Sequence, residues 1–188
     1  TPVRALRRDP GGVRVELADR VERFDHAIVA THADEALRLL ADPRPAERER
    51  LGPWRYSVNR AVLHTDASVL PPARRAWSAW NYAREAGADL DAPVSVTYHM
   101  NRLQRLRTHR EYCVSLNRRG PLRPDRVVHE TSYTHPVYTF ESLASQPALR
   151  RENGADRTWF CGSYFGWGFH EDAVRSAVDV ARAFGGEL

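Results

Sequence analysis

The sequence contains no lysine, so arginine supplies all 28 of its basic residues. These arginines are scattered among 24 acidic residues and leave a net charge of only +4. Proteins that bind nucleic acid usually gather their cations into a patch or stripe, which this sequence does not do. We attribute the arginine bias to codon composition and expect no nucleic-acid partner.

Long apolar runs and metal-binding motifs are also missing. No run approaches the roughly 20 apolar residues that a membrane helix needs, and no secretory leader opens the sequence, so we expect no membrane span and a cytoplasmic location. Cysteine is scarce, and Cys113 and Cys161 lie in apolar, strand-like runs that predict buried, reduced thiols. Neither CxxC nor HExxH occurs, so we expect no metal site.

The standard loop motifs of catalysis and phosphate binding are absent as well. Ser163 stands in GSYFG, which does not have the GxSxG spacing of a serine-hydrolase elbow. Gly162, Gly166 and Gly168 match neither the P-loop spacing nor GxGxxG. The sequence therefore argues against a serine hydrolase and against both common phosphate loops.

What is present indicates a globular fold. A chain of 188 residues with 42% hydrophobic residues can bury a real core, as one domain or as part of a larger one. Strand-like sequence begins almost at Thr1, without a preceding helix or cap, and we expect that the N-terminal part of a larger protein precedes it.

The first 40 residues predict one unit of an open α/β sheet. Two alternating runs flank DPGG (9–12) and predict a β-hairpin. The apolar run AIVA (27–30) predicts a strand that is covered on both faces. Thr31 is the expected N-cap of the following helix, with Asp34 three residues on.

The middle of the chain has a different texture. Residues 41–54 are proline-rich and predict a linker that carries one short charged helix. From Asn59 to Tyr138, short aromatic and β-branched runs predict a mostly antiparallel sheet. Its aromatic side chains could line a cavity or pack a core.

The last quarter predicts a strand at TWFCG (158–162), a turn with three glycines, and a helix from His170 to Phe184. Residues with helical spacing are expected on the buried side of this helix: Ala173, Val174, Ala177, Val178, Ala181 and Phe184. Three glycines so close together suggest that another group approaches the turn closely.

The start of this last helix also constrains what could bind there. Its first turn offers unpaired N–H groups and a partial positive charge. Glu171 and Asp172 already complement that charge and would repel a phosphate. A neutral or delocalised acceptor such as a ring carbonyl fits better, and the alternative is that the acids and glycines only stabilise the turn.

The order of these features resembles a known family. AIVAT (27–31), the aromatic middle and TWFCGSYFGWGFHEDAVRSAVDVA (158–181) resemble the C-terminal half of FAD-dependent, flavin-containing amine oxidoreductases, most closely a bacterial branch described as predicted NAD/FAD-binding oxidoreductases. The resemblance covers essentially the whole chain. It implies a mixed α/β (α+β) fold in which residues 1–52 and 141–188 are parts of a Rossmann-like FAD-binding domain and residues 53–140 form a substrate-binding subdomain.

The resemblance also implies a set of FAD-binding residues. Val3 would meet the adenine, Ala30 and Thr31 would lie near the dinucleotide, and Gly162 and Ser163 would follow the ribityl and pyrophosphate part. The residues that would face the isoalloxazine ring are Gly168, His170, Glu171 and Asp172. A helix N-terminus there would stabilise the anionic reduced ring.

The implied function is hydride transfer to flavin from an amine or an unsaturated, lipid-like substrate. Flavin would supply the redox chemistry, so no residue is assigned a catalytic role. The expected substrate-facing wall comprises Trp80, Tyr82, Tyr98, Phe165 and Trp167. The alternative is a non-catalytic α+β domain that binds a ligand or partner through its aromatic sheet.

One departure from the family pattern limits what this chain does alone. The GxGxxG fingerprint that holds the pyrophosphate in the family does not occur in the sequence. We therefore expect the isolated chain to bind FAD weakly or not at all and to be inactive. The missing half of the protein would dock on an exposed apolar surface, through which the isolated chain could also dimerise.

Overall fold

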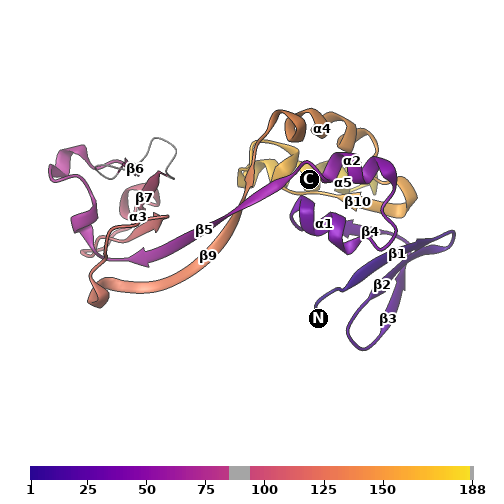
Figure 1. The fold of residues 1–188 in the computed structure, drawn as a ribbon, viewed down its shortest axis with the longest axis horizontal. Coiled ribbons are helices and arrows are strands. Elements are labelled where there is room, and N and C mark those ends of the chain that lie inside the picture. The colour runs from indigo at the N-terminus through magenta and orange to yellow at the C-terminus, as the bar shows by residue number, and fades with distance from the viewer. Residues whose placement is uncertain (85–93, 187–188) are drawn as a thin grey trace. The chain divides into compact units, whose positions relative to one another are not determined.

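A computed structural model describes residues 1–84 and 94–186 of the chain. The chain divides into two compact units (Figure 1). We call Thr1–Ser57 with His135–Leu188 the discontinuous unit, and Val58–Thr134 the inserted unit. The predicted division placed these boundaries at 52/53 and 140/141.

The discontinuous unit begins with a three-stranded antiparallel sheet. Strands β1 (Ala5–Asp9), β2 (Gly12–Glu16) and β3 (Val21–Phe24) are adjacent in that order. Asp9 pairs with Gly12 across the DPGG turn, which confirms the predicted hairpin.

A two-stranded parallel sheet joins segments that are distant in the sequence. β4 (Ala27–Val29) pairs with β10 (Thr158–Phe160), with Val29 opposite Phe160. Within the described part of the chain, the other edge of β4 carries no strand. Ile28 is 54% exposed, so the expectation of a strand covered on both faces is wrong for this side chain.

Four helices pack around these strands (Figure 1). They are α1 (Ala33–Leu39), α2 (Pro45–Leu51), α4 (Phe140–Arg151) and α5 (His170–Ala183). The N-cap of α1 is His32, whose N–H donates to Glu35 Oε2 at 3.2 Å. The prediction of Thr31 and Asp34 was therefore one residue too early, because His32 still has a non-helical ψ of 154°.

The short helix that the linker was expected to contain is α2, and it belongs to the core. Proline occupies its first turn, where its missing N–H costs no hydrogen bond. Leu51 at its end is fully buried, and so is Trp54 just beyond it. Trp54 Nε1 donates to Ser145 Oγ of α4 at 3.2 Å, which ties α2 and its following turn to α4.

The buried side of α5 differs from the prediction. Ser176 and Val180 are its buried residues, whereas Val174, Ala177 and Phe184 of the expected set are exposed. Ser176 is buried because its Oγ accepts from Gly162 N at 2.9 Å and donates to the backbone. Ala173, Val178 and Ala181 of the expected set are half-buried, and the ring of Phe184 packs on Trp159 with centroids 5.0 Å apart.

The inserted unit is built on an antiparallel sheet, as predicted. The strand order is β6 (Trp80–Ala83), β7 (Ser95–His99), β8 (Cys113–Leu116), β5 (Arg55–His64) and β9 (Val127–Val137). A short helix, α3 (Met100–Leu103), follows β7, and the 3-10 helices η1 (Ala67–Val69), η2 (Arg74–Ala76) and η3 (Pro124–Arg126) lie in the connections. The mixed fold class is thus confirmed.

Both cysteines are buried and unpaired by disulfide, as expected. Burial raises the pKa of the Cys113 thiol to about 12, so it stays protonated at neutral pH. None of the helices in the described ranges has the length and apolar character that crossing a membrane would need.

Candidate functional site

The parallel pair β4/β10 creates a crevice at its carboxyl end. Ala30 and Thr31 follow β4, and Gly162 and Ser163 follow β10. Cys161 N donates to Val29 O at 3.2 Å, which keeps the two segments together at the ends of the strands. In open α/β sheets, ligands bind in the crevice outside the carboxyl ends of the strands. The topology therefore selects this end as the candidate site.

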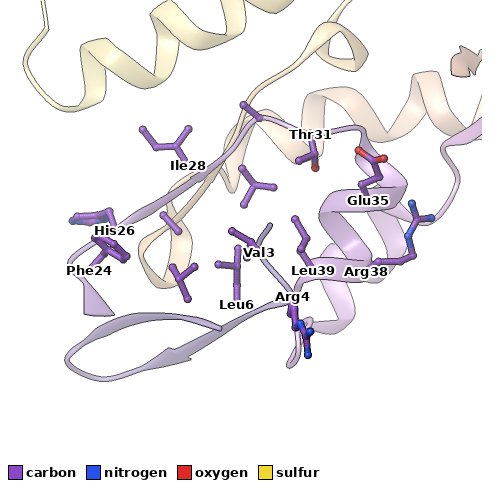
Figure 2. Close-up of a pocket in the computed structure, with 14 residues that line it drawn as sticks. Val3, Arg4, Leu6, Phe24, His26, Ile28, Thr31, Glu35, Arg38 and Leu39 are labelled. Carbon is purple, nitrogen blue, oxygen red and sulfur yellow. The ribbon is translucent and has the colours of Figure 1, made fainter. Parts of the chain in front are cut away.

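Two cavities open at this crevice. The larger, of about 660 Å³, is the one drawn in Figure 2. The smaller has about 380 Å³ and lies between the ends of the two strands and the first residues of α1. Ala30, Thr31 and Glu35 line both cavities, so the two adjoin.

The larger cavity is mainly apolar. Figure 2 shows Val3, Leu6 and Leu39 at its centre, with Glu35 and Arg38 of α1 at one side. Its volume lies within the roughly 300–1,000 Å³ typical of small-molecule sites. The smaller cavity is lined by His32, Ser163 and Tyr164 as well as by the shared residues.

Four residues of the smaller cavity were not expected as site residues from the sequence: His32, Glu35, Tyr164 and Ala173. The Tyr164 hydroxyl is buried without a hydrogen-bond partner among the described residues, and burial raises its pKa. The ring of His32 stacks on Tyr56 with centroids 4.4 Å apart. The usable signal was position: His32 directly follows Thr31, Glu35 lies in the first turn of the helix that begins there, and Tyr164 directly follows Ser163.

The structure accounts for the three glycines of the turn. A Cβ at Gly162 would lie 2.7 Å from the Tyr164 ring, and one at Gly168, where φ is +90°, would lie 2.9 Å from the Tyr138 hydroxyl. A Cβ at Gly166 would overlap the Asp172 carboxylate. The groups that approach the turn closely are therefore side chains of the protein itself.

Helices α4 and α5 hold the turn from both sides. Asp172 Oδ2 accepts from Trp167 N at 2.9 Å and from Phe169 N at 3.0 Å. From α4, Gln146 Nε2 donates to the carbonyls of Tyr164 and Gly166 at 2.9 and 2.8 Å. Arg150 of α4 also donates to the Phe165 carbonyl. These hydrogen bonds hold the turn in its shape.

The predicted flavin-facing residues lie around this turn but line neither of the two cavities. Gly168, His170 and Glu171 are exposed at the start of α5. Asp172 is half-buried, and its carboxylate accepts hydrogen bonds from backbone N–H groups of the turn. By contrast, Val3 joins Ala30 and Thr31 in the larger cavity, and Gly162 and Ser163 join them in the smaller one.

The predicted substrate-facing residues separate into two groups. Trp80, Tyr82 and Tyr98 share one side of the sheet in the inserted unit, where Trp80 lies opposite Tyr98 with ring centroids 5.7 Å apart. In the discontinuous unit, Trp167 is 67% exposed. Phe165 is only 3% exposed, and its substrate-facing role stays a prediction. It packs on Tyr164 in the core, with ring centroids 4.9 Å apart.

Comparison with known proteins decides the family. The model of the flavin-containing amine oxidoreductases matches residues 1–184. The chain belongs to this family. The resemblance to this family, inferred from AIVAT and from the closing motif, is thereby confirmed.

Solved structures of this fold agree with the family. A fatty acid isomerase from P. acnes superposes with a TM-score of 0.64 at 13% identity, over 97% of this chain and 47% of that one. Cyclohexylamine oxidase from Brevibacterium oxydans IH-35A gives 0.64 at 13%, over 98% and 48%. A double mutant of putrescine oxidase gives 0.61 at 12%, over 96% and 48%. The chain therefore spans about half the length of these proteins, and no match was found among curated protein sequences.

Family membership implies a flavin cofactor, and the crevice fits part of one. The larger cavity offers apolar walls at Val3 and Leu39 for a flat base. The smaller is lined by Ser163, whose side chain carries a hydroxyl for polar groups, and by Tyr164. A pyrophosphate fingerprint does not occur in this sequence, so the fit is to one side of the cofactor only.

Proposed function

We propose that this chain forms part of an FAD-dependent oxidoreductase that takes hydride from an amine or from an unsaturated, lipid-like substrate. The observation that carries the proposal is the crevice at the carboxyl ends of β4 and β10, in a chain of the flavin-containing family. Bound flavin would accept the hydride. The chain's own task would be to bind, orient and shield.

In this proposal the residues of the crevice hold different parts of the cofactor. Val3 would contact the adenine in the larger cavity, where the walls are apolar. Ala30, Thr31, Gly162 and Ser163 would follow the chain that links adenine to the ring, since they line the smaller cavity between the strand ends.

The turn and the start of α5 would face the ring. The carboxylate of Asp172 is bonded to the turn, and the first N–H groups of α5, at His170 and Glu171, have no acceptor within the helix. A helix N-terminus favours negative charge nearby by roughly 0.3–1 kcal/mol when exposed. It would therefore favour the anionic reduced form of the ring.

We also propose that the rest of a longer protein covers the open parts of the discontinuous unit. Parallel sheets are normally buried on both faces, yet Ile28 of β4 and Val174 of α5 are each 54% exposed. The missing half of the protein would pair with the free edge of β4 and pack on α5. Without it, the isolated chain would bind FAD weakly, be inactive, and dimerise through this surface.

The test is flavin binding measured with a matched pair of variants. A longer protein that contains this chain and a dinucleotide fingerprint is purified, and its visible absorbance is recorded per chain. Ala30→Leu fills both cavities from an exposed position, whereas Ala73→Leu adds the same atoms to an exposed position of the inserted unit.

We expect about one flavin per chain in the parent and in Ala73→Leu, and a loss of flavin in Ala30→Leu. Anaerobic addition of an amine or an unsaturated acyl substrate should bleach the flavin bands. A longer protein without flavin, or an Ala30→Leu variant that keeps it, would contradict the proposal. It would favour the alternative of a non-catalytic binding domain.

A further inference from the structure

Arginine is spread over the whole chain, but one segment of the inserted unit concentrates it without acidic neighbours. We call residues 100–112, which begin with α3 and lead to β8, the basic loop. The basic loop contains a single acidic residue, Glu111. Every residue from 102 to 110 is exposed. Its basic residues are four arginines and one histidine: Arg102, Arg105, Arg107, His109 and Arg110.

Hydrogen bonds within the basic loop give it a defined shape. Met100 N donates to Tyr112 O at 2.8 Å, so the two ends of the loop lie side by side. Asn101 Nδ2 donates to Arg110 O at 2.6 Å, and Asn101 Oδ1 accepts from Tyr112 N at 2.7 Å. Leu106 N donates to Asn101 O at 2.9 Å. Loops that close on their own residues in this way are compact and are frequently functional.

The protein does not neutralise most of these arginines. In residues 1–84 and 94–186, no carboxylate forms an ion pair with three of them: Arg105, Arg107 and Arg110. The carboxylate of Glu111 is already engaged, because its Oε2 lies 2.7 Å from His99 Nε2 and its Oε1 pairs with Arg74. The basic loop therefore presents several positive charges to its surroundings.

A second segment extends the basic surface. Arg74 and Arg75 of η2 are exposed, and Trp77 directly follows this helix. Arg102 Nη1 donates to Trp77 O at 2.7 Å, which ties the basic loop to the end of η2. The guanidinium carbon of Arg74 lies 4.9 Å from the centre of the Trp77 ring. The basic surface thus joins two segments that are distant in the sequence.

Exposed leucines lie between the arginines of the basic loop. Leu103 is 43% exposed and Leu106 is 38% exposed. A single exposed leucine is ordinary. Leucines that alternate with unpaired arginines are typical of segments that lie in the surface of a membrane, where cations meet lipid phosphates and apolar side chains reach the acyl boundary.

Nucleic acid fits this composition less well. It would use the arginines, but its charged backbone would gain nothing from Leu103 and Leu106. Proteins that bind single strands also stack the bases on aromatic side chains. No phenylalanine, tyrosine or tryptophan occurs between Met100 and Glu111. The leucines therefore favour a lipid surface over a nucleic acid.

The rest of a longer protein is also a poorer cover for the basic loop. A protein segment that buried these arginines would have to bring a carboxylate for each, because an unpaired buried charge is costly. A bilayer surface supplies many phosphates and leaves the ion pairs hydrated. The surface that we assign to the rest of the protein is of another kind, because Ile28 and Val174 are apolar.

We infer that the basic loop, together with Arg74 and Arg75, binds the surface of an anionic phospholipid bilayer. The arginines contact lipid phosphates, Leu103 and Leu106 enter the boundary with the acyl chains, and no part of the loop crosses the bilayer. This binding goes beyond the proposed function and does not depend on it.

The test measures co-sedimentation with vesicles for the longer protein of the flavin test and for the 188-residue chain. One set of vesicles contains equal parts of phosphatidylglycerol and phosphatidylcholine, and the other contains phosphatidylcholine alone. We expect both proteins to bind the anionic vesicles and neither to bind the neutral ones. Raising the salt from about 0.1 M to about 1 M shortens the Debye length from about 10 Å to about 3 Å and should release both proteins.

Two pairs of substitutions test the position of the arginines. Each arginine near an anionic surface strengthens binding by roughly fivefold. Arg107→Gln combined with Arg110→Gln should therefore weaken vesicle binding at least tenfold. Arg48→Gln combined with Arg151→Gln removes the same charge from exposed positions of the discontinuous unit and should leave binding unchanged. Equal losses in the two pairs would overturn the inference in favour of a diffuse attraction by net charge.

The leucines distinguish a bilayer from other partners. Leu103→Ser combined with Leu106→Ser should weaken vesicle binding several-fold and leave the midpoint of urea unfolding unchanged, since both side chains are exposed. If this pair leaves vesicle binding unchanged and a DNA duplex is bound more tightly than the vesicles, the inference is wrong and the partner is a nucleic acid.

Two further outcomes would overturn the inference. One is the absence of binding to anionic vesicles by either protein. The other is binding by the 188-residue chain but not by the longer protein, because the rest of the longer protein would then cover the basic loop. Vesicle binding needs no flavin, so these outcomes are separate from those of the flavin test.

Discussion

The two sides of the sheet in the inserted unit differ in burial and in chemistry. The polar side, which contains Thr97, Ser115 and His64, is buried and its side chains bond to one another. The opposite side, which we call the apolar strip, carries two rows of paired residues: Trp80, Tyr98, Val114 and Leu63, and then Tyr82, Val96, Leu116 and Ala61. Trp80 and Tyr82 of the apolar strip are 46% and 67% exposed. A buried polar group is costly unless it is bonded, so each member of the polar side depends on its neighbours. Substitutions on the polar side should therefore destabilise the fold more than substitutions of exposed residues on the apolar strip.

The polar side is centred on His64, which has a defined tautomer. The backbone N–H of Asp66 donates to His64 Nδ1 at 3.2 Å, so Nδ1 is the acceptor and Nε2 carries the proton. Nε2–H then donates to Ser115 Oγ. Ser115 is left to donate to Thr97 Oγ1, which makes a directed chain of hydrogen bonds across three strands.

The largest effect is expected from His64→Ala. The substitution leaves a cavity at a fully buried position and removes the partner of Ser115. Cavity formation and an unsatisfied buried group together predict a loss of about 3 kcal/mol in the free energy of unfolding. Urea unfolding of the 188-residue chain measures it. A loss below about 1 kcal/mol would show that the polar side does not carry the stability.

Ser115→Ala should have the next largest effect, about 1–2 kcal/mol, because it leaves His64 and Thr97 without their shared partner. Thr97→Val removes one of the same bonds. The double variant should therefore lose less than the sum of the two single losses. Strict additivity in urea unfolding would mean that the three side chains do not act as one network.

A smaller effect is expected from pH. Burial lowers the pKa of His64 below its usual value of 6.5, with Asp66 opposing the shift and Arg118 adding to it. The native state therefore holds His64 neutral, and the unfolded state binds a proton first as pH falls. The stabilisation is complete above about pH 6.5 and declines as pH falls from there towards the lowered pKa. Urea unfolding between pH 5 and 8 should show this decline.

His64→Gln is the control for the pH effect, since an amide N–H can still donate to Ser115 but does not titrate in this range. The difference in stability between wild type and His64→Gln should shrink on acidification. If the two curves run parallel, another group causes the pH dependence.

The alternating pattern of the strands allowed part of this comparison to be predicted. The sequence predicted a mostly antiparallel sheet here, and the family resemblance implied a wall that includes Trp80 and Tyr82. The sequence could not say which side is buried, because the cover comes from connecting segments such as the one that carries Trp77, which have no periodic pattern. The sheet itself was therefore predictable from the sequence, but the burial of its polar side was not.

The glycine turn and α5 of the discontinuous unit also depend on partners that the local sequence does not reveal. The glycine spacing correctly indicated a close approach, but Tyr138 and Asp172 are among the groups that approach. Tyr138 is 30 residues away in the sequence from Gly168, beyond the reach of a local pattern. The helical period of α5 defined an apolar stripe, but Ser176 was drawn into the core by its bonds to Gly162. A local sequence pattern shows which residues share one face of a helix or strand. Residues distant in the sequence decide which of its faces is buried.

The smallest effect is expected from Tyr82→Ser on the apolar strip. Tyr82 is 67% exposed, and exposed substitutions usually change stability by no more than about 0.5 kcal/mol. Urea unfolding should therefore leave this variant indistinguishable from wild type, in contrast to Ser115→Ala two strands away. A loss as large as that of Ser115→Ala would break the comparison, because it would mean that the apolar strip stabilises the fold. An unchanged stability would show that Tyr82, although it is paired with Val96, has no role in the stability of the fold.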